Sequence, residues 1–201
     1  VFAENPAKLS LIGVKNYSGV DTIGGRNLED AVNDLLSNEF RKAVDGYRGR
    51  KATSDLIKNV DLSLYYEAEN LCTNADLAAI GRKIGSAELG ILEINGYSEI
   101  RREKSGKSYQ LLLGLKVLNS KTEEEQYLSA EGLSEKSRDD AFAKAVQQLV
   151  GAYLRKQVVS EERSLRDENA PVIGHLSSLM YHLPQCNHLP RKDLQVSMKS
   201  R

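Results

Sequence analysis

The fold is decided by Leu89-Gly-Ile-Leu-Glu-Ile-Asn-Gly-Tyr-Ser-Glu-Ile-Arg-Arg102, by Ser108-Tyr-Gln-Leu-Leu-Leu-Gly-Leu-Lys-Val-Leu-Asn119 and by Glu125-Gln-Tyr-Leu-Ser-Ala-Glu-Gly132. The hydrophobic period changes to two over these segments, which predicts consecutive strands. Turn-forming residues at 104–106 and 120–123 separate them. Because short connections join adjacent antiparallel strands, the sequence predicts a three-stranded antiparallel meander.

The residues before the meander predict further strands and helices. Leu9–Tyr17 is typical of a buried strand, and a glycine-rich turn at 18–27 follows it. Asn27 is suited to cap a helix whose apolar positions recur on one face: Leu28, Ala31, Val32, Leu35, Leu36, Phe40 and Ala43. We expect a basic loop at 46–54, a second strand at 61–66, and a short helix capped by Thr73 or Asn74 and ended by Gly85.

A strong amphipathic pattern over 141–154 predicts a last helix, which Ser137 and Asp140 would begin. The expected order is β-α-β-α-β-β-β-α, an α/β fold with a mixed sheet, an antiparallel meander and flanking helices. We divide the chain into an N-terminal extension at 1–8, an α/β domain at 9–156, a charged linker or helix extension at 157–170, and a small tail at 171–201.

The glycine turn is a candidate phosphate-binding loop, because it joins a strand to a helix N-terminus. Gly19 and Gly24 have the P-loop spacing, but Gly25 stands in place of the lysine and Arg26 in place of the hydroxyl residue. The simpler interpretation is that Gly19, Gly24 and Gly25 allow turns with positive φ. We therefore expect no bound nucleotide and no other required cofactor.

Composition excludes several classes of partner. The 201 residues contain 28 Lys plus Arg and 28 Asp plus Glu, so no global charge favours nucleic acid or an anionic membrane. No apolar stretch is long enough to predict a transmembrane segment. Val1-Phe-Ala3 fits the end of a removed signal peptide, which indicates an exported protein.

The body also carries a family resemblance. Gly13-Val-Lys-Asn-Tyr-Ser-Gly19, the helix at 75–85 and Gly90-Ile-Leu-Glu-Ile-Asn-Gly96 resemble the envelope group that contains CsgG, the TolB N-terminal domain and the lipoprotein activators of penicillin-binding proteins. The resemblance implies a non-catalytic α/β module, periplasmic or associated with the outer membrane, that binds protein partners or forms a homo-oligomer. Residues 9–155 show no acid, base and nucleophile constellation, so we expect no enzyme. Candidate contact regions are the basic segment 47–51 and the hairpin end near 101–102.

The tail resembles a different element. Gly174, Ser178, Tyr181, His182 and Cys186 fit the G-x-x-x-S-x-x-Y-H-x-x-x-C pattern of a small module appended to thermonuclease-like secreted nucleases. That module is similar to a zinc-binding repair-protein domain, although the second cysteine of its usual ending is missing here. The side chains themselves suggest a metal site at His182, Cys186 and His188, with His175 as a fourth ligand, because imidazole and thiolate suit zinc or copper.

Other interpretations of the tail stay open. Cys186 and Tyr181 could pack a short hairpin core with no metal, and Cys186 could pair with Cys72 in an oxidising compartment. Two functional hypotheses follow. The first is an exported bacterial cell-envelope accessory protein that acts by protein association; the second is a metal-binding or nucleic-acid-associated accessory protein that works through its tail.

Overall fold

The computed structural model describes residues 7–61, 73–102 and 106–164, together with three short strands near the C-terminus. The chain divides into two compact units, Val1–Arg155 and Lys156–Arg201. In the second unit, β8 (Val172–Gly174) pairs antiparallel with β9 (Tyr181–His182) and with β10 (Val196–Met198).

The first unit contains the main sheet and its helices. In chain order its elements are β1 (Ala7–Asn16), β2 (Thr22–Ile23), β3 (Arg26–Asn27), α1 (Leu28–Ala43), β4 (Tyr47–Arg48), α2 (Arg50–Val60), α4 (Asn74–Lys83), β5 (Ser86–Arg102), β6 (Gly106–Asn119) and β7 (Glu125–Ser134). The helix α5 (Arg138–Ser164) follows β7 and is the last element of this series.

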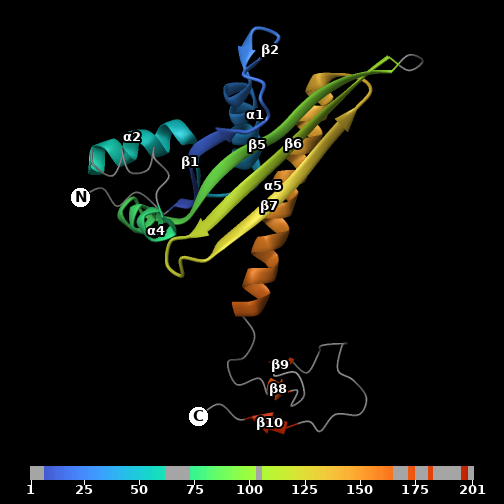
Figure 1. Cartoon of the computed structure of the whole chain (residues 1–201). Helices are drawn as coiled ribbons and strands as arrows, with labels where there is room; N and C mark the ends of the chain where they lie inside the picture. Colours follow the sequence, from blue (N-terminus) through green and yellow to red (C-terminus); the bar gives the residue numbers. More distant parts are fainter. Residues whose placement is uncertain are drawn as a thin grey trace. The chain divides into compact units, whose positions relative to one another are not determined.

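The sheet is mixed, as the sequence predicts. Its strand order is β4-β1-β5-β6-β7 (Figure 1). Strand β1 is parallel to both of its neighbours, and β6 is antiparallel to both β5 and β7. The expected meander is therefore confirmed. Its strands are longer than predicted, because β5 begins at Ser86 and β7 ends at Ser134.

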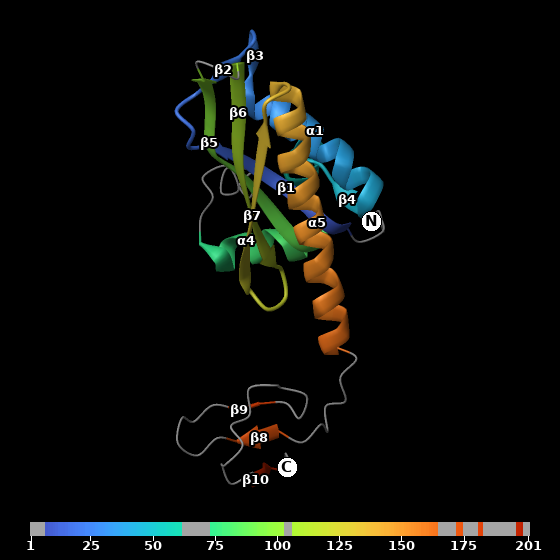
Figure 2. The ribbon, with the colours of Figure 1, turned by 90° about the vertical axis from the view of Figure 1, so that its right-hand side faces the viewer.

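One face of the sheet is covered by α1 and α5 (Figure 2). The predicted apolar face of α5 is confirmed, since Phe142, Val146, Leu149 and Tyr153 are all buried. On this face the two helices pack against every second side chain of β6: Leu111, Leu113, Leu115 and Val117. Burial of large apolar side chains of this kind is the main stabilising contribution to the fold.

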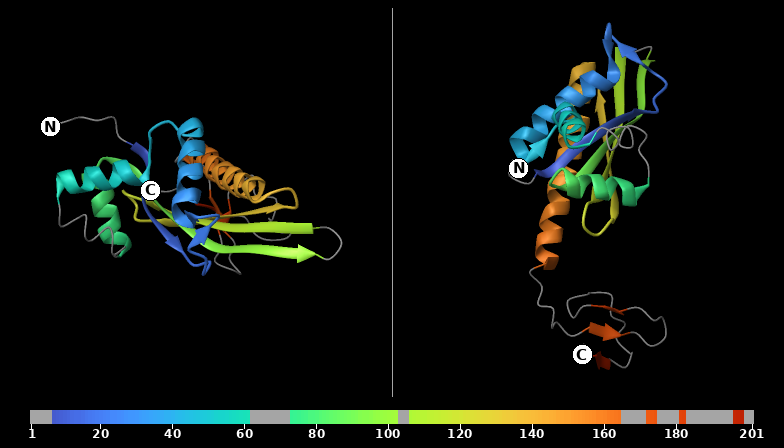
Figure 3. Two further views of the ribbon diagram at one scale, coloured as in Figure 1. Left: turned by 90° about the horizontal axis from the view of Figure 1, so that it is seen from above. Right: turned by 90° about the vertical axis from the view of Figure 1, so that its left-hand side faces the viewer.

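The other face is covered only in part. Helices α2 and α4 pack on β1 and on the adjoining ends of β5 and β6, where Ile57, Leu77 and Ile80 meet Ile12, Leu89 and Ile91. Figure 1 and the left view of Figure 3 place these two helices beside one end of the long strands. The remaining length of β5, β6 and β7 has no described helix on this face.

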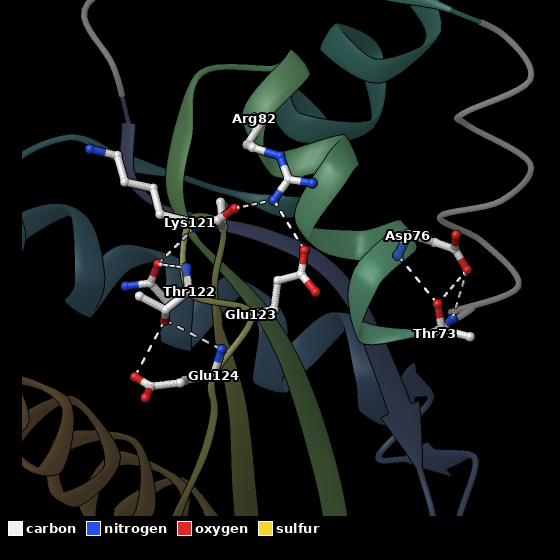
Figure 4. A network of polar contacts seen from close by, with 9 residues as sticks. Thr73, Asp76, Arg82, Lys121, Thr122, Glu123 and Glu124 are labelled. Carbon is white, nitrogen blue, oxygen red and sulfur yellow. Dashed lines mark hydrogen bonds and ion pairs between the residues drawn. The ribbon is translucent and has the colours of Figure 1, made fainter.

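Polar contacts fasten α4 to the turn between β6 and β7 (Figure 4). Thr73 and Asp76 form the reciprocal capping box that begins the helix, which confirms Thr73 as its cap. At the other end, the Arg82 guanidinium donates to the Ser120 carbonyl at 2.7 Å and lies 3.4 Å from the Glu123 carboxylate. The positive φ of 66° at Gly85 then ends the helix, as expected.

The predicted basic loop at 46–54 is wrong. Tyr47–Arg48 forms a short strand beside β1, and α2 begins at Arg50, directly after Gly49. Thr53 and Ile57 are four residues apart and point to the same side, so one helical face is buried although the charged residues Arg50, Lys51 and Asp55 dominate the sequence. The predicted strand at 61–66 lies outside the described residues except for Asp61, which caps the end of α2.

The last helix is longer than the predicted 141–154, because it runs from Arg138 to Ser164. The Ser137 hydroxyl accepts the Asp140 backbone N–H at 3.1 Å, which confirms the predicted cap. The Asp140 carboxylate accepts from the Ser134 hydroxyl at 2.6 Å, so it ties the helix to the end of β7. The charged segment after residue 156 is thus a helix extension as far as Ser164.

Candidate functional site

The glycine turn forms a small hairpin. Gly24 and Gly25 lie between β2 and β3 with φ of 58° and 78°, the two positive values that a two-residue type I′ turn requires. Gly19 also has positive φ, so the conformational prediction for the three glycines is confirmed. Asn27 is the N-cap of α1 and accepts the Asp30 N–H at 3.1 Å. The turn therefore has a structural explanation that needs no phosphate.

A hollow of about 460 Å³ lies between this hairpin, α1 and the start of α5. Its charged lining consists of Arg26 and Arg138 together with Asp34 and Asp139. The Arg138 Nε lies 3.7 Å from the Asp139 carboxylate, so part of the positive charge already has a partner. Two cations and two anions give this hollow no net preference for an anionic ligand.

The partly covered face of the sheet presents the most distinctive surface among the described residues. Large apolar side chains are exposed there on three adjacent strands: Ile100 on β5, Leu112 on β6, and Tyr127 and Leu133 on β7. We call this surface, together with the polar side chains between these residues, the open face. Exposed fractions reach 51% at Tyr127 and 52% at Leu133. Apolar side chains gathered in this way mark interaction sites more often than scattered ones do.

Tyr127 is held across the open face by two neighbours. Its ring lies over Gly114 on β6, where a Cβ atom would come within 2.6 Å of the tyrosine Cζ. Its hydroxyl accepts from the Asn95 side-chain amide on β5 at 2.7 Å. Partial burial and the nearby Glu93 carboxylate and Tyr17 raise the Tyr127 pKa, while the Asn95 bond opposes them. The phenol is therefore neutral at physiological pH.

Polar pairs surround the apolar side chains. The Gln110 amide donates to the Glu131 carboxylate at 2.6 Å, and the Lys116 amine lies 2.7 Å from the Glu125 carboxylate. Hydrogen bonds from Lys116 and from Asn74 lower the Glu125 pKa. An apolar centre with satisfied polar groups around it has the composition of a protein–protein interface.

The structure places the predicted contact regions differently. Tyr47 stacks on Phe40 with ring centroids 5.2 Å apart, and its hydroxyl lies 3.1 Å from that of Ser37. The Arg48 guanidinium donates to the Ile84 carbonyl at 3.2 Å, so both residues contribute to packing. The side chains of Arg101 and Arg102, at the predicted hairpin contact, lie outside the described residues.

The open face was missed by the sequence analysis. Leu112 lies between two buried leucines in an unbroken apolar run, and Tyr127 and Leu133 belong to the strand with the weakest apolar content. The signal that could have found them is the six-residue spacing of Tyr127 and Leu133, which puts both on one face of a strand.

The side chains of the predicted metal ligands lie outside the described part of the chain. His182 belongs to β9, but only its backbone is described, and His175, Cys186 and His188 lie outside the described residues. Cys72, the proposed disulfide partner of Cys186, lies outside them too. Within the described ranges no cluster of His, Cys, Asp and Glu has the arrangement of a metal site. The zinc site stays a prediction.

None of the helices in the described part of the chain combines the length and apolarity needed to cross a bilayer.

Comparison with known proteins gives only distant likenesses. No family model matches the chain, and no curated protein matches it. Similar solved structures include lipoprotein GNA1162 from Neisseria meningitidis, which is 12% identical with a TM-score of 0.45 and an alignment that covers 79% of this chain and 99% of that one.

The PelC dodecamer from Paraburkholderia phytofirmans is 10% identical, with a TM-score of 0.43 and coverage of 72% of this chain and 85% of that one. Protein XCC0632 from Xanthomonas campestris is 10% identical, with a TM-score of 0.41 and coverage of 80% and 89%. None of these three proteins bears the name of CsgG, TolB or a nuclease. Likenesses at these scores carry no argument about the family, activity or partners of this chain.

Proposed function

We propose that this chain is an exported bacterial cell-envelope accessory protein that acts by binding other proteins and catalyses no reaction. The observation that carries the proposal is the open face, where Leu112, Tyr127 and Leu133 are exposed on adjacent strands. The balanced charge and the resemblance of residues 9–155 to the CsgG and TolB group support the same function.

The chemistry of the open face favours a protein as its ligand. Its apolar side chains lie on a broad sheet surface, whereas small-molecule sites are enclosed hollows with a few converging polar groups. The Tyr127 ring is fixed by Gly114 and Asn95, so little side-chain freedom is lost when a partner packs on it. Rigid aromatic side chains of this kind often contribute much of the binding energy of an interface.

Substitution of Leu112 tests the association. Leu112 and Leu154 are equally exposed, at 36% and 38%, but Leu154 is on α5 and outside the open face. The change Leu112→Arg should abolish recovery of partners that co-purify with the full-length protein, and Leu154→Arg should leave their recovery unchanged. Equal recovery with both variants would contradict binding at the open face.

Localisation and ligand binding test the other parts of the proposal. Expression of the complete gene followed by cell fractionation should recover the protein in the envelope fraction. A thermal-shift screen with ATP, GTP and NAD should show no stabilisation, whereas a ligand at a hundredfold excess over its Kd would stabilise the fold by about 2.7 kcal/mol. Such a stabilisation, lost in Arg26→Ala, would refute the non-catalytic assignment.

A further inference from the structure

The strand β7 is an edge strand of the five-stranded sheet. Just before it, the Glu124 carbonyl accepts the Asn119 N–H at 2.9 Å, so the backbone groups at even positions point toward β6. The N–H and C=O groups of Tyr127, Ser129, Glu131 and Leu133 therefore point away from the sheet. The Leu133 carbonyl confirms this direction, since it accepts from the Lys144 amine on α5 at 3.2 Å.

This edge has little of the usual protection against strand pairing: its charged side chains are the carboxylates of Glu125 and Glu131, and one outward carbonyl, that of Leu133, accepts from Lys144. Edge strands are commonly short, or carry lysine or proline, or are bent by a bulge. β7 has ten residues and contains no lysine, arginine or proline, and its ladder with β6 is regular from Glu125 to Ser134. Its outward-facing backbone groups form no strand ladder with any other described part of the chain.

We propose that β7 pairs antiparallel with β7 of a second copy of this chain, with Ala130 opposite its own counterpart. A two-fold interface brings residue i against j and j against i, so it requires a self-complementary strand. With Ala130 on the axis, Tyr127 lies opposite Leu133 of the second copy, and Ser129 lies opposite Glu131 of the second copy. The two most exposed apolar side chains of β7 then cover each other twice in one dimer.

The neighbouring registers are less favourable. In an antiparallel pair, two opposite residues point their backbone groups the same way: both toward the partner strand or both away from it. The two-fold axis of the dimer must therefore pass through a residue of β7 and cannot pass between two residues. An axis at Leu128 puts Glu125 against Glu131, and one at Glu131 puts that carboxylate against its own copy. An axis at Ser129 puts carboxylates against Tyr127 and Leu133. Like charges directly opposite are destabilising. Within β7 the Ala130 register avoids both arrangements, and Glu125 then lies opposite Glu135, the first residue after the strand.

Pairing at Ala130 extends the open face. Side chains opposite each other in an antiparallel pair lie on the same side of the sheet, so the two sheets join into one of ten strands and the two open faces become one surface across six of them. Lys144 can keep its bond to Leu133, because a carbonyl oxygen has two lone pairs. This inference rests on the proposed function, because it makes a second copy of the chain one of the proteins that extend the open face.

Disulfide cross-linking of the full-length protein tests the register. The test uses a background with Cys72→Ser and Cys186→Ser. In it, Ala130→Cys places one thiol of each copy at a non-hydrogen-bonded pair of the new ladder, where the Cα atoms are about 4.5 Å apart and a disulfide can form. The matched control Ser129→Cys places them diagonally, about 7–8 Å apart. Mild oxidation with diamide should give covalent dimers of Ala130→Cys and leave Ser129→Cys monomeric. Cross-linking of Ser129→Cys alone would overturn the register.

Proline substitutions test the edge itself. Ser129→Pro removes an outward N–H and should abolish the dimer in sedimentation while the monomer stays folded. Ala130→Pro removes an N–H that faces β6, so it should lower the unfolding midpoint as well. A dimer that survives Ser129→Pro would show that another surface pairs, and it would overturn the proposal.

A monomer at every concentration would also overturn the proposal. Slow amide exchange of the Ser129 and Glu131 N–H groups in such a monomer would then identify another segment of this chain as the occupant of the edge. The proposed function would survive either result, since it depends on partner capture through Leu112, which lies on β6.

Discussion

Two glycines on adjacent strands should respond differently to the same substitution. An added Cβ at Gly132 on β7 would overlap the Ala141 carbonyl and come within 2.6 Å of the Ala145 nitrogen, both of which are backbone atoms of α5. An added Cβ at Gly114 on β6 would overlap only side-chain ends, those of Tyr127 and, at 2.9 Å from its amide nitrogen, of Asn95. A helix backbone cannot withdraw without repacking the core, whereas a tyrosine can rotate into solvent.

The magnitudes follow from these contacts. Gly132→Ala should destabilise the fold by about 1–3 kcal/mol through overpacking. Gly114→Ala should cost about 1 kcal/mol for the lost bond between Tyr127 and Asn95, and about 0.5–1 kcal/mol is regained because alanine is favoured over glycine within a strand. The net change at Gly114 is therefore close to zero.

Urea denaturation checks the reasoning with six proteins: the wild type and Tyr127→Ala, each alone, with Gly114→Ala and with Gly132→Ala. In a Tyr127→Ala background no ring lies over Gly114, and the Asn95 amide has lost its bond to the tyrosine hydroxyl and can turn away from the added Cβ. Gly114→Ala should then stabilise the fold by about 0.5–1 kcal/mol. The cost of Gly132→Ala should be the same in both backgrounds. A Gly132→Ala protein with native stability would refute the close packing of α5 on β7, and an unchanged effect of Gly114→Ala would refute the position of Tyr127.

Three further predictions concern the core, the response to pH and the tail. Leu149→Ala should destabilise the first unit by about 2–5 kcal/mol in urea denaturation, because Leu149 is fully buried between α5 and the sheet. Glu125 has a lowered pKa, so its interaction with Lys116 and Asn74 stabilises the fold above the ordinary carboxyl pKa of 4.5, and this stabilisation is lost as the pH falls below that value. In Glu125→Gln the free energy of unfolding should therefore fall less steeply with acid than in the wild type. Elemental analysis of untagged protein should find zinc or copper if His182, Cys186 and His188 form a site, with occupancy that falls in acid, and below about a tenth of an equivalent the metal site is refuted.

Local rules in the sequence predicted most of the sheet and its helices. The period of two over 89–132 fixed the meander, and Asn27, Thr73 and Ser137 were identified as helix caps because their side chains can bond to first-turn N–H groups. The helix α2 was missed because its buried face is narrow: Thr53 and Ile57 are its only fully buried side chains, amid charged residues. A short amphipathic segment of this kind becomes a helix through tertiary packing.

The candidate site could not be predicted in the same way. Exposure of Leu112 depends on where α2 and α4 lie, and they cover one end of the strands because their apolar side chains meet Ile12, Leu89 and Ile91. Nothing in the alternation of β6 distinguishes a covered face from an open one. The support that Gly114 gives to Tyr127 likewise depends on the register between β6 and β7, which pairs Gly114 with Ser129.

The central claim is that partner proteins bind on the open face. Site-specific photo-cross-linking in cells tests it most directly, with a photoreactive amino acid at position 112 and a matched control at position 154, which is equally exposed on α5. We predict discrete cross-linked species from position 112 and none from position 154. Cross-links from position 154 alone, or none from either position, would contradict the account.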